Sequence, residues 1–178
     1  MPPILLTQRL RLRPPRREDL EDIYRLGSSS RVMRFITPGR TQDREEARQD
    51  LEKRIATAAN PLGYWITELK ENGAFIGWMA LKPLDEGPVV EIGYRFLEDY
   101  WGRGYATEGG EKILDYAFRT LQLKKVAAVA IEENRASTRV MEKLGMQYLR
   151  NGVYYGTDCV YYEISQEEFL ARADYRQQ

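Results

Sequence analysis

The chain has 178 residues, 27 of them basic and 27 acidic, so its formal net charge at pH 7 is zero and general attraction to nucleic acid is not expected. It has no histidine and one cysteine, Cys159, which excludes a Ser-His-Asp triad, His-ligated metals and cysteine-cluster zinc sites. With no signal-peptide pattern and no apolar run near the roughly 18 residues of a membrane span, we expect a cytoplasmic protein.

The first third of the chain predicts a strand and two helices. Residues 7–13 alternate polar and apolar, which is typical of a half-buried strand, and a short helix then ends at Gly27. Thr41 is expected to cap a helix over residues 41–59. The arginines of this region are expected on a solvated strand edge and helix start, with an acidic partner as the alternative: Arg9, Arg11, Arg13, Arg16 and Arg17.

The rest of the chain predicts a sheet with interspersed helices. Asn72-Gly73 indicates a hairpin turn, and a helix is expected to follow the sequence EDYWGRGYATEGG. A further helix is expected over residues 135–144, ending at Gly145. Tyrosines are expected to alternate along the strands. The predicted strands cover residues 64–70, 75–82, 89–97, 124–131, 147–155 and 158–164. Because no repeat or long linker appears, we expect one α/β (α+β) domain over residues 1–178 with its core at about 7–165.

The segment from Trp101 to Thr107 carries the strongest chemical signal. Two glycines one residue apart allow a sharp turn and a close approach to a ligand, and the following helix offers unpaired N–H groups. Together they make a cradle suited to a pyrophosphate, to which Arg103 adds a charge. A tight loop without a ligand is the alternative. The pattern fits neither a Walker loop nor a Rossmann fingerprint.

About 30 residues downstream, Asn134 ends a strand and begins a polar helix. The pair of motifs WGRGYATEGG and NRASTRVMEKLGMQY resembles the coenzyme-binding motifs of the GNAT acetyltransferase superfamily. The opening TQRLRLRPPRREDLEDIY looks like the start of its ribosomal-protein N-terminal-alanine acetyltransferase branch. The resemblance covers roughly residues 7–165. It implies a mixed, mostly antiparallel central sheet of about seven strands, with helices on both faces and a splayed central strand.

The resemblance also implies acetyl-CoA as cosubstrate. Asn134 would hydrogen-bond the pantetheine amides, and Arg139 would meet a coenzyme phosphate or lie on a solvated helix face. The backbone of Phe96 and Leu97 would run beside the pantetheine arm. Trp101 departs from the family's Gln or Arg, while Gly104 and Ala106 match its pattern. The pyrophosphate would be held by amides of the segment Gly102, Arg103, Gly104, Tyr105, Ala106 and Thr107.

For catalysis we favour Glu91 as the base, because it lies in the central strand where the family often has a carboxylate; pairing with a nearby arginine is the alternative. Met141 occupies the position at which many members of this superfamily have a tyrosine that acts as the general acid. Ser137, where the resembling branch has a serine near the thiolate, is the candidate acid. Its alternative is a first-turn hydroxyl bonded to its own helix.

These residues predict a transferase that moves acetyl from acetyl-CoA to a primary amine by direct attack, without a covalent enzyme intermediate or a metal. The acceptor is a protein N-terminus or a small-molecule amine. Residues 30–65 and the last two strands are expected to form its site. Alternatives are a non-catalytic acyl-CoA-binding sensor or scaffold and, more weakly, a nucleotide binder. We expect a monomer or homodimer with no nucleic-acid or membrane partner.

Overall fold

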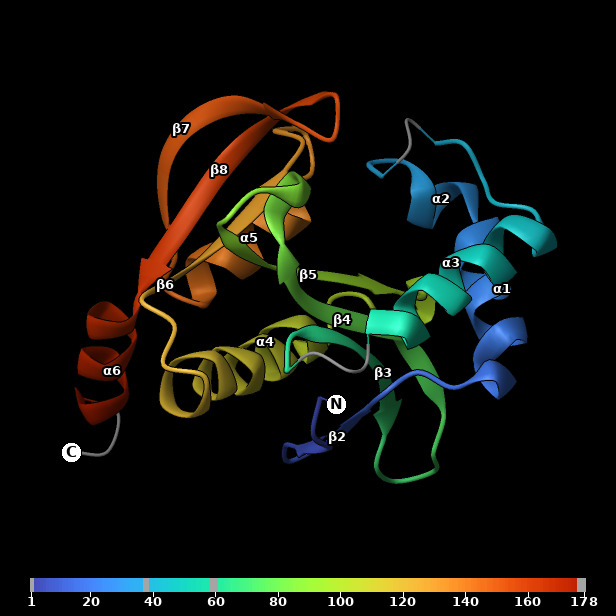
Figure 1. The fold of residues 1–178 in the computed structure, drawn as a ribbon, viewed down its shortest axis with the longest axis horizontal. Helices are drawn as coiled ribbons and strands as arrows, with labels where there is room; N and C mark the ends of the chain where they lie inside the picture. Colours follow the sequence, from blue (N-terminus) through green and yellow to red (C-terminus); the bar gives the residue numbers. More distant parts are fainter. Residues whose placement is uncertain (1, 37–38, 58–60, 176–178) are drawn as a thin grey trace. The chain divides into compact units, whose positions relative to one another are not determined.

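The computed structural model describes residues 2–36, 39–57 and 61–175, among which no helix has the length and apolar character that crossing a membrane requires. Its eight strands are β1 (Leu5–Leu6), β2 (Leu10–Arg13), β3 (Gly63–Leu69), β4 (Phe75–Pro83), β5 (Val90–Phe96), β6 (Lys125–Ala130), β7 (Gln147–Tyr154) and β8 (Thr157–Ser165). They form one sheet in the order β1-β2-β3-β4-β5-β6-β8-β7 (Figure 1). The pairs β1–β2, β2–β3, β6–β8 and β7–β8 are antiparallel, and β5–β6 is parallel. The predicted mixed, mostly antiparallel sheet is confirmed, with the two-residue β1 as an addition.

Six α-helices accompany these strands in the described part of the chain. They are α1 (Leu20–Ser28), α2 (Ser30–Met33), α3 (Arg44–Ala56), α4 (Tyr105–Asp115), α5 (Arg135–Lys143) and α6 (Gln166–Tyr175). The chain continues from α4 into a π-helical turn at Tyr116–Thr120. The sequence did not predict α2 or α6, because neither shows the long apolar period that marks an amphipathic helix.

The chain divides into two compact units. The first unit comprises Met1–Ala80 with Tyr94–Gly109, and the second comprises Leu81–Gly93 with Gly110–Gln178. The strands β4 and β5 and the helix α4 each contribute residues to both units. A single domain over residues 1–178 therefore stays a prediction.

The core of the first unit lies between its helices and β4. Trp78 and Ala80 belong to a buried cluster that includes Leu26 of α1 and Leu51 of α3. Because strand side chains alternate, Met79 points to the other face, where a Cβ added at Gly109 of α4 would lie 2.4 Å from its sulfur. Helices thus cover both faces of the sheet within this unit. Burial of each large apolar side chain stabilises the fold by about 1.5–3 kcal/mol.

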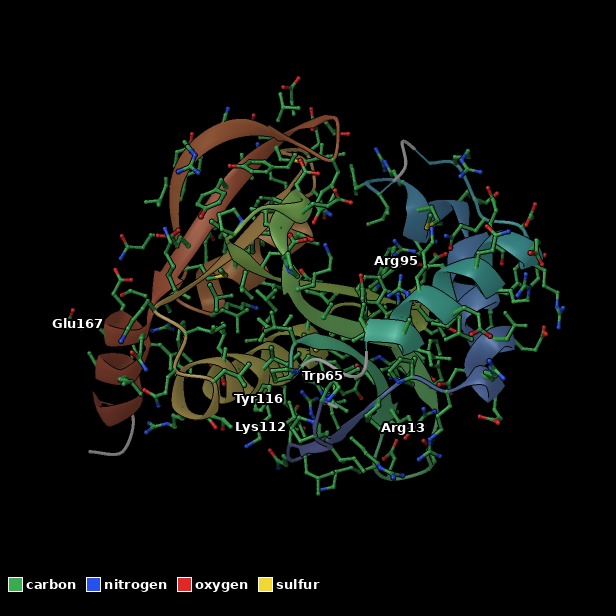
Figure 2. The ribbon with its side chains drawn as sticks, viewed as in Figure 1. Arg13, Trp65, Arg95, Lys112, Tyr116 and Glu167 are labelled. Carbon is green, nitrogen blue, oxygen red and sulfur yellow. The ribbon has the colours of Figure 1, made fainter. Side chains whose placement is uncertain are left out.

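Two tight contacts fix the strands of the first unit. Trp65 of β3, labelled in Figure 2, is fully buried. Its indole N–H donates to the carbonyl of Pro3 at 2.8 Å. Gly77 of β4 lies against β5 so closely that a Cβ would be 2.1 Å from the carbonyl oxygen of Arg95. Only glycine fits where the two backbones approach this closely.

The helix α3 begins later than the sequence predicted. Its N-cap is Asp43, whose carboxylate accepts from the backbone N–H of Glu46 at 2.8 Å, while the Glu46 carboxylate accepts from the N–H of Asp43 at 2.9 Å. This reciprocal capping box replaces the predicted cap at Thr41, because aspartate satisfies the first-turn donors as well as threonine and has its glutamate three residues on. Residues 58–59 of the predicted helix lie outside the described residues.

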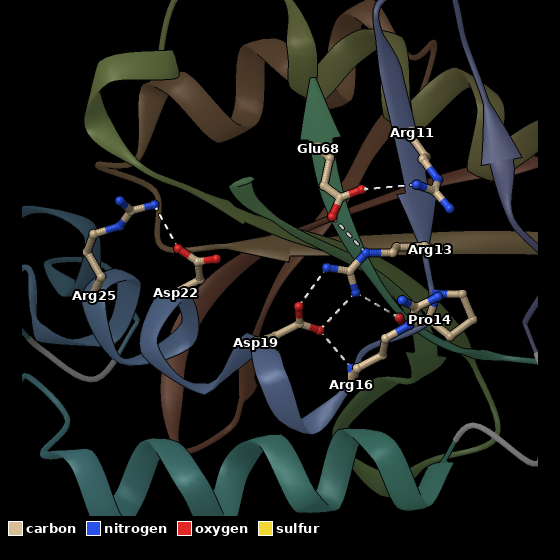
Figure 3. A network of polar contacts seen from close by, with 8 residues as sticks. All are labelled: Arg11, Arg13, Pro14, Arg16, Asp19, Asp22, Arg25 and Glu68. Atoms are coloured by element: carbon tan, nitrogen blue, oxygen red, sulfur yellow. Dashed lines mark hydrogen bonds and ion pairs between the residues drawn. The ribbon is translucent and has the colours of Figure 1, made fainter. Parts of the chain in front are cut away.

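Arg13 corrects the expectation of a solvated arginine edge. Its side chain is 9% exposed and donates to both carboxylate oxygens of Asp19, at 2.6 and 2.9 Å, and to Glu68 at 2.7 Å (Figure 3). These bonds raise the pKa of Arg13 despite its burial. The pairing of β2 with β3 and the turn that carries Asp19 create this environment, neither of which is visible in local sequence. Arg11 is exposed, as expected.

The second unit is built on β6, β8 and β7. The turn between β7 and β8 holds Tyr155 at φ +53 and Gly156 at φ +71, so Tyr155 lies in a turn instead of alternating along a strand. Cys159 of β8 is 8% exposed, and burial raises the pKa of its thiol. Among the described residues, the parallel pairing of β5 with β6 is at Glu91 and Ala127.

Candidate functional site

The bend from Trp101 to Thr107, here called the cradle, belongs entirely to the first unit. Gly102 and Gly104 have φ values of +70 and +80, the left-handed region that favours glycine. The N–H of Trp101 donates to Glu98, and the first helical bond of α4 runs from the N–H of Glu108 to the carbonyl of Gly104 at 3.0 Å. Among the described residues, the backbone N–H groups of residues 104–107 have no acceptor. The cradle therefore presents a run of free donors at the positive end of a helix dipole.

Arg9 holds the carbonyl side of the cradle. Its Nη1 donates to the carbonyl of Arg103 at 3.1 Å, its Nε donates to Glu108 at 2.6 Å, and its guanidinium lies 4.5 Å from the centroid of the Tyr105 ring. Glu108 also accepts from the hydroxyl of Thr7 and the backbone N–H of Arg9. Burial opposes ionisation of Glu108, but these hydrogen bonds outweigh it and lower its pKa. Arg9 thus secures the loop, a role that a solvated strand edge did not predict.

The segment before the cradle is partly used by the protein itself. The indole N–H of Trp101 donates to the carbonyl of Phe96 at 2.8 Å, which gives this departure from the family pattern a structural function. The N–H of Leu97 donates to Ile76 at 2.9 Å, and its carbonyl accepts from Tyr100 at 3.0 Å. A carbonyl oxygen has two lone pairs, so the carbonyls of Phe96 and Leu97 can each accept a further hydrogen bond. The Leu97 N–H has a single proton to donate, and its bond to Ile76 already uses it.

The second unit brings Asn134 and Ser137 together. Asn134 is the N-cap of α5, and its side-chain oxygen accepts from the backbone N–H of Ser137 at 3.3 Å. An N-cap of this kind satisfies an orphan donor of the first helical turn. Arg139 lies further along α5 and is exposed to solvent.

Glu91 also belongs to the second unit, where it is 5% exposed on β5. Its carboxylate accepts from the ammonium of Lys82 and from the hydroxyl of Tyr155. The partner cation is thus a lysine instead of an arginine. Burial by itself would lower the pKa of Lys82, but the charge and hydrogen bond of Glu91 outweigh burial and raise it. Burial and the hydrogen bond to Glu91 raise the pKa of Tyr155.

Three residues with strained backbone conformations fix the position of the Glu91 carboxylate and its hydrogen-bond donors. Tyr155, Asp85 and Glu86 have φ values of +53, +47 and +59, which are costly for residues with a Cβ. The N–H of Asp85 donates to the Tyr155 hydroxyl at 3.0 Å, and the N–H of Tyr155 donates to the Asp85 carboxylate at 3.1 Å. This reciprocal link fixes the phenol beside Glu91. Sequence reasoning missed Lys82 and Tyr155; the Tyr-Gly turn between two strands was the available signal.

The predicted site residues therefore fall into two sets. The cradle, Phe96 and Leu97 belong to the first unit. Glu91, Asn134, Ser137 and Arg139 belong to the second unit, where Asn134 contacts Ser137 at the start of α5 and Glu91 contacts other partners on β5.

Comparison with known proteins places this geometry in context. Residues 9–147 match the family described as Acetyltransferase (GNAT) domain. YkkB of Bacillus subtilis, an uncharacterized protein, is 36% identical over 151 residues, which cover 81% of this chain and 85% of that protein. FsC-acetyl coenzyme A-N(2)-transacetylase of Aspergillus fumigatus is 31% identical, over 94% of this chain and 78% of its own. A crystal structure of a GNAT-family acetyltransferase from Bacillus anthracis superposes with a TM-score of 0.82 at 26% identity, covering 93% of this chain and 99% of that one.

Proposed function

Because the chain belongs to the GNAT family of acetyl-CoA-dependent N-acetyltransferases, we propose that its cradle binds the pyrophosphate of acetyl-CoA. The observation that carries this proposal is the run of backbone N–H groups at residues 104–107, for which the described residues supply no acceptor. Such donors at a helix N-terminus suit a doubly charged anion. The cradle is open, because a Cβ at Gly102 would meet no atom within 4 Å and one at Gly104 would meet only Arg9, at 3.5 Å.

In the same proposal, residues of the second unit serve the rest of the coenzyme. The Asn134 side-chain oxygen caps α5, which leaves its NH₂ group to donate to a pantetheine carbonyl. Ser137 is assigned to the leaving thiolate, and the exposed Arg139 to a coenzyme phosphate. Phe96 and Leu97 of the first unit are assigned to the pantetheine arm, with their carbonyls as the available groups.

Bound acetyl-CoA supplies a thioester carbonyl that an amine attacks, with release of the CoA thiol. The acceptor amine is mostly ammonium at pH 7 and must lose a proton before it attacks. We assign that proton to the carboxylate of Glu91, directly or through water. Lys82 and Tyr155 hold the carboxylate in one orientation, which supports the precise placement that general base catalysis needs.

The acceptor is a primary amine, either on a small molecule or at a protein N-terminus. The Aspergillus relative is by name an acetyl coenzyme A-N(2)-transacetylase, which supports a nitrogen acceptor. The resemblance of the two motifs to the N-terminal-alanine branch supports the protein alternative. A non-catalytic acyl-CoA sensor is disfavoured, because the family consists of acetyltransferases.

The test is turnover. The protein is mixed with acetyl-CoA and a panel of amines that includes peptides with free N-termini, amino acids, polyamines and aminoglycosides, and release of free thiol is followed. We expect thiol release above the rate without protein for at least one class. Tight CoA binding with no release for any amine would contradict the enzymatic proposal and favour a sensor. Competition for the protein by ATP or NAD but not by CoA would contradict the cradle assignment.

A further inference from the structure

Two arginines of the first unit lie against one indole ring. The guanidinium carbons of Arg54 on α3 and Arg95 on β5 are 4.1 and 5.1 Å from the centroid of the Trp78 ring. Arg54 also lies 4.3 Å from the centroid of Tyr64, whose ring meets Trp78 edge to face at 5.6 Å. Figure 2 shows Arg95 on the side of the sheet where α3 lies. The aromatic rings thus hold two like charges close together.

The donors of this cluster outnumber its acceptors. Arg54 is 5% exposed and donates from Nη2 to Asp50 at 2.7 Å. Its Nε and Nη1, and the Nε of Arg95, are buried without a hydrogen-bond partner in the described part of the protein. Buried donors are nearly always paired, because an unpaired one loses its hydration without compensation. This concentration of unpaired donors points to a ligand that supplies the missing acceptors.

The charges of the cluster are also unbalanced. Among the described residues, the carboxylate of Asp50 accepts a hydrogen bond from Arg54, and no carboxylate pairs with Arg95. Burial, together with the positive charge of Arg54, lowers the pKa of Arg95 to about 10. Because Arg95 is half-buried and has a like charge beside it, it lowers the free energy of unfolding. Strained or unbalanced groups of this kind are typical of binding sites.

The coenzyme is not the natural source of this anion. The helix α4, which follows the cradle, packs on Met79 through Gly109. Trp78, the neighbour of Met79, points to the opposite face and carries the two arginines. Within the first unit, the helix that follows the cradle and the arginine pair thus lie on opposite faces of the sheet, which favours a ligand other than the coenzyme at the arginine pair.

We propose that Arg95, backed by Arg54, binds a carboxylate carried by the acceptor amine, so that the enzyme selects acidic acceptors; this rests on the proposed function. The planar guanidinium of Arg95 matches a carboxylate with two parallel hydrogen bonds. The same positive charge repels polycationic acceptors such as polyamines and aminoglycosides. Arg54, held by its contacts with Trp78 and Tyr64, adds a second positive charge beside Arg95.

The test uses two matched pairs of acceptors that differ only in a carboxylate against its carboxamide. They are the C-terminally amidated tripeptides Ala-Glu-Ala and Ala-Gln-Ala, and 4-aminobutanoate with its amide. For the wild type we expect a kcat/KM at least tenfold higher for the acid member of a pair. Arg95→Met is expected to remove this preference and to leave the KM for acetyl-CoA unchanged. The control is Arg17→Met, which removes the same charge from a side chain that is 78% exposed.

Equal kcat/KM values for the two members of each pair, or an equal loss for both in Arg95→Met, would overturn the inference while the proposed function stands. Turnover of spermidine but of neither pair would overturn it as well. If no amine is turned over, calorimetric titration of the acid members into CoA-loaded protein still decides: binding at least tenfold weaker in Arg95→Met supports the site, and unchanged binding refutes it. The melting temperature of Arg95→Met should be no lower than that of Arg17→Met.

Discussion

The hydroxyl of Tyr155 donates its hydrogen bond to the carboxylate of Glu91, although 64 residues separate them in the chain. Tyr155 reaches this position from a strained turn, and Lys82 binds the same carboxylate. A buried carboxylate with two donors and a fixed orientation can serve either as a structural anchor or as a catalytic base. Rate measurements separate the two roles.

We expect Glu91→Gln to lower kcat by about 100-fold or more, the usual contribution of a general base, and to leave CoA affinity within about twofold. Tyr155→Phe should lower kcat by about tenfold, because the carboxylate loses one of the bonds that orient it. The matched control is Tyr154→Phe on the same hairpin, whose hydroxyl contacts Arg150 instead. Steady-state kinetics with CoA binding checks all three variants, and a wild-type kcat for Glu91→Gln would eliminate Glu91 as the base.

Gly104→Val is expected to weaken CoA binding at least tenfold, because a branched side chain enters the cradle. Valine at φ +80 also costs about 1–3 kcal/mol of stability. Gly73→Val is the matched control, since Gly73 has φ +72 in the 71–74 turn and an added Cβ there meets nothing within 4 Å. Calorimetric titration of CoA into both variants makes the comparison. Equal dissociation constants for the two variants would show that the cradle is not the pyrophosphate site.

The stability contribution of Glu108 should depend on pH. Its pKa in the folded protein lies below the usual 4.5, so the contribution is present at neutral pH and is lost as the pH falls through the lowered value. Glu108→Gln should therefore lower the unfolding free energy by about 1–3 kcal/mol at pH 7 and by less at pH 3. Urea unfolding at both pH values is the measurement, with Glu71→Gln, exposed in the 71–74 turn, as the control. If Glu108→Gln lowers the unfolding free energy by the same amount at both pH values, the ionised Glu108 carboxylate contributes nothing to stability.

Arg13→Met should destabilise the protein by about 3–5 kcal/mol, because it leaves the buried carboxylate of Asp19 without its cation and removes the nearer cation of Glu68. Arg11→Met removes an exposed arginine 3.9 Å from the same Glu68 and should cost less than about 1 kcal/mol. Chemical denaturation of both variants distinguishes the two environments. Similar losses would indicate that Arg13 is no better paired than a surface arginine.

Local chemistry made much of the fold predictable. The Asn72-Gly73 turn, the two strands that flank it and the helix that ends before Gly145 follow from residue type and period, and the structure has them at nearly the predicted positions. The cap of α3 was placed two residues early, because both Thr41 and Asp43 are good N-caps and only the capping box with Glu46 separates them.

The side-chain partners of the site were less predictable. The glycines of the cradle are visible in the sequence because a left-handed backbone needs glycine. The bonds of Arg9 to Glu108, of Tyr155 to Glu91 and of Tyr155 to Asp85 join residues that are far apart in the chain. Such partners depend on strand register and hairpin placement, which one sequence without relatives does not reveal.

The burial of Cys159 in β8 has a practical consequence for assays. Because the chain has only this one sulfhydryl and packing shields it, a thiol-reactive dye added to a reaction should report coenzyme release with little background from the folded enzyme. The rate at which the dye labels Cys159 would in turn measure how often the β7–β8 hairpin opens, so local unfolding could be followed without an engineered probe.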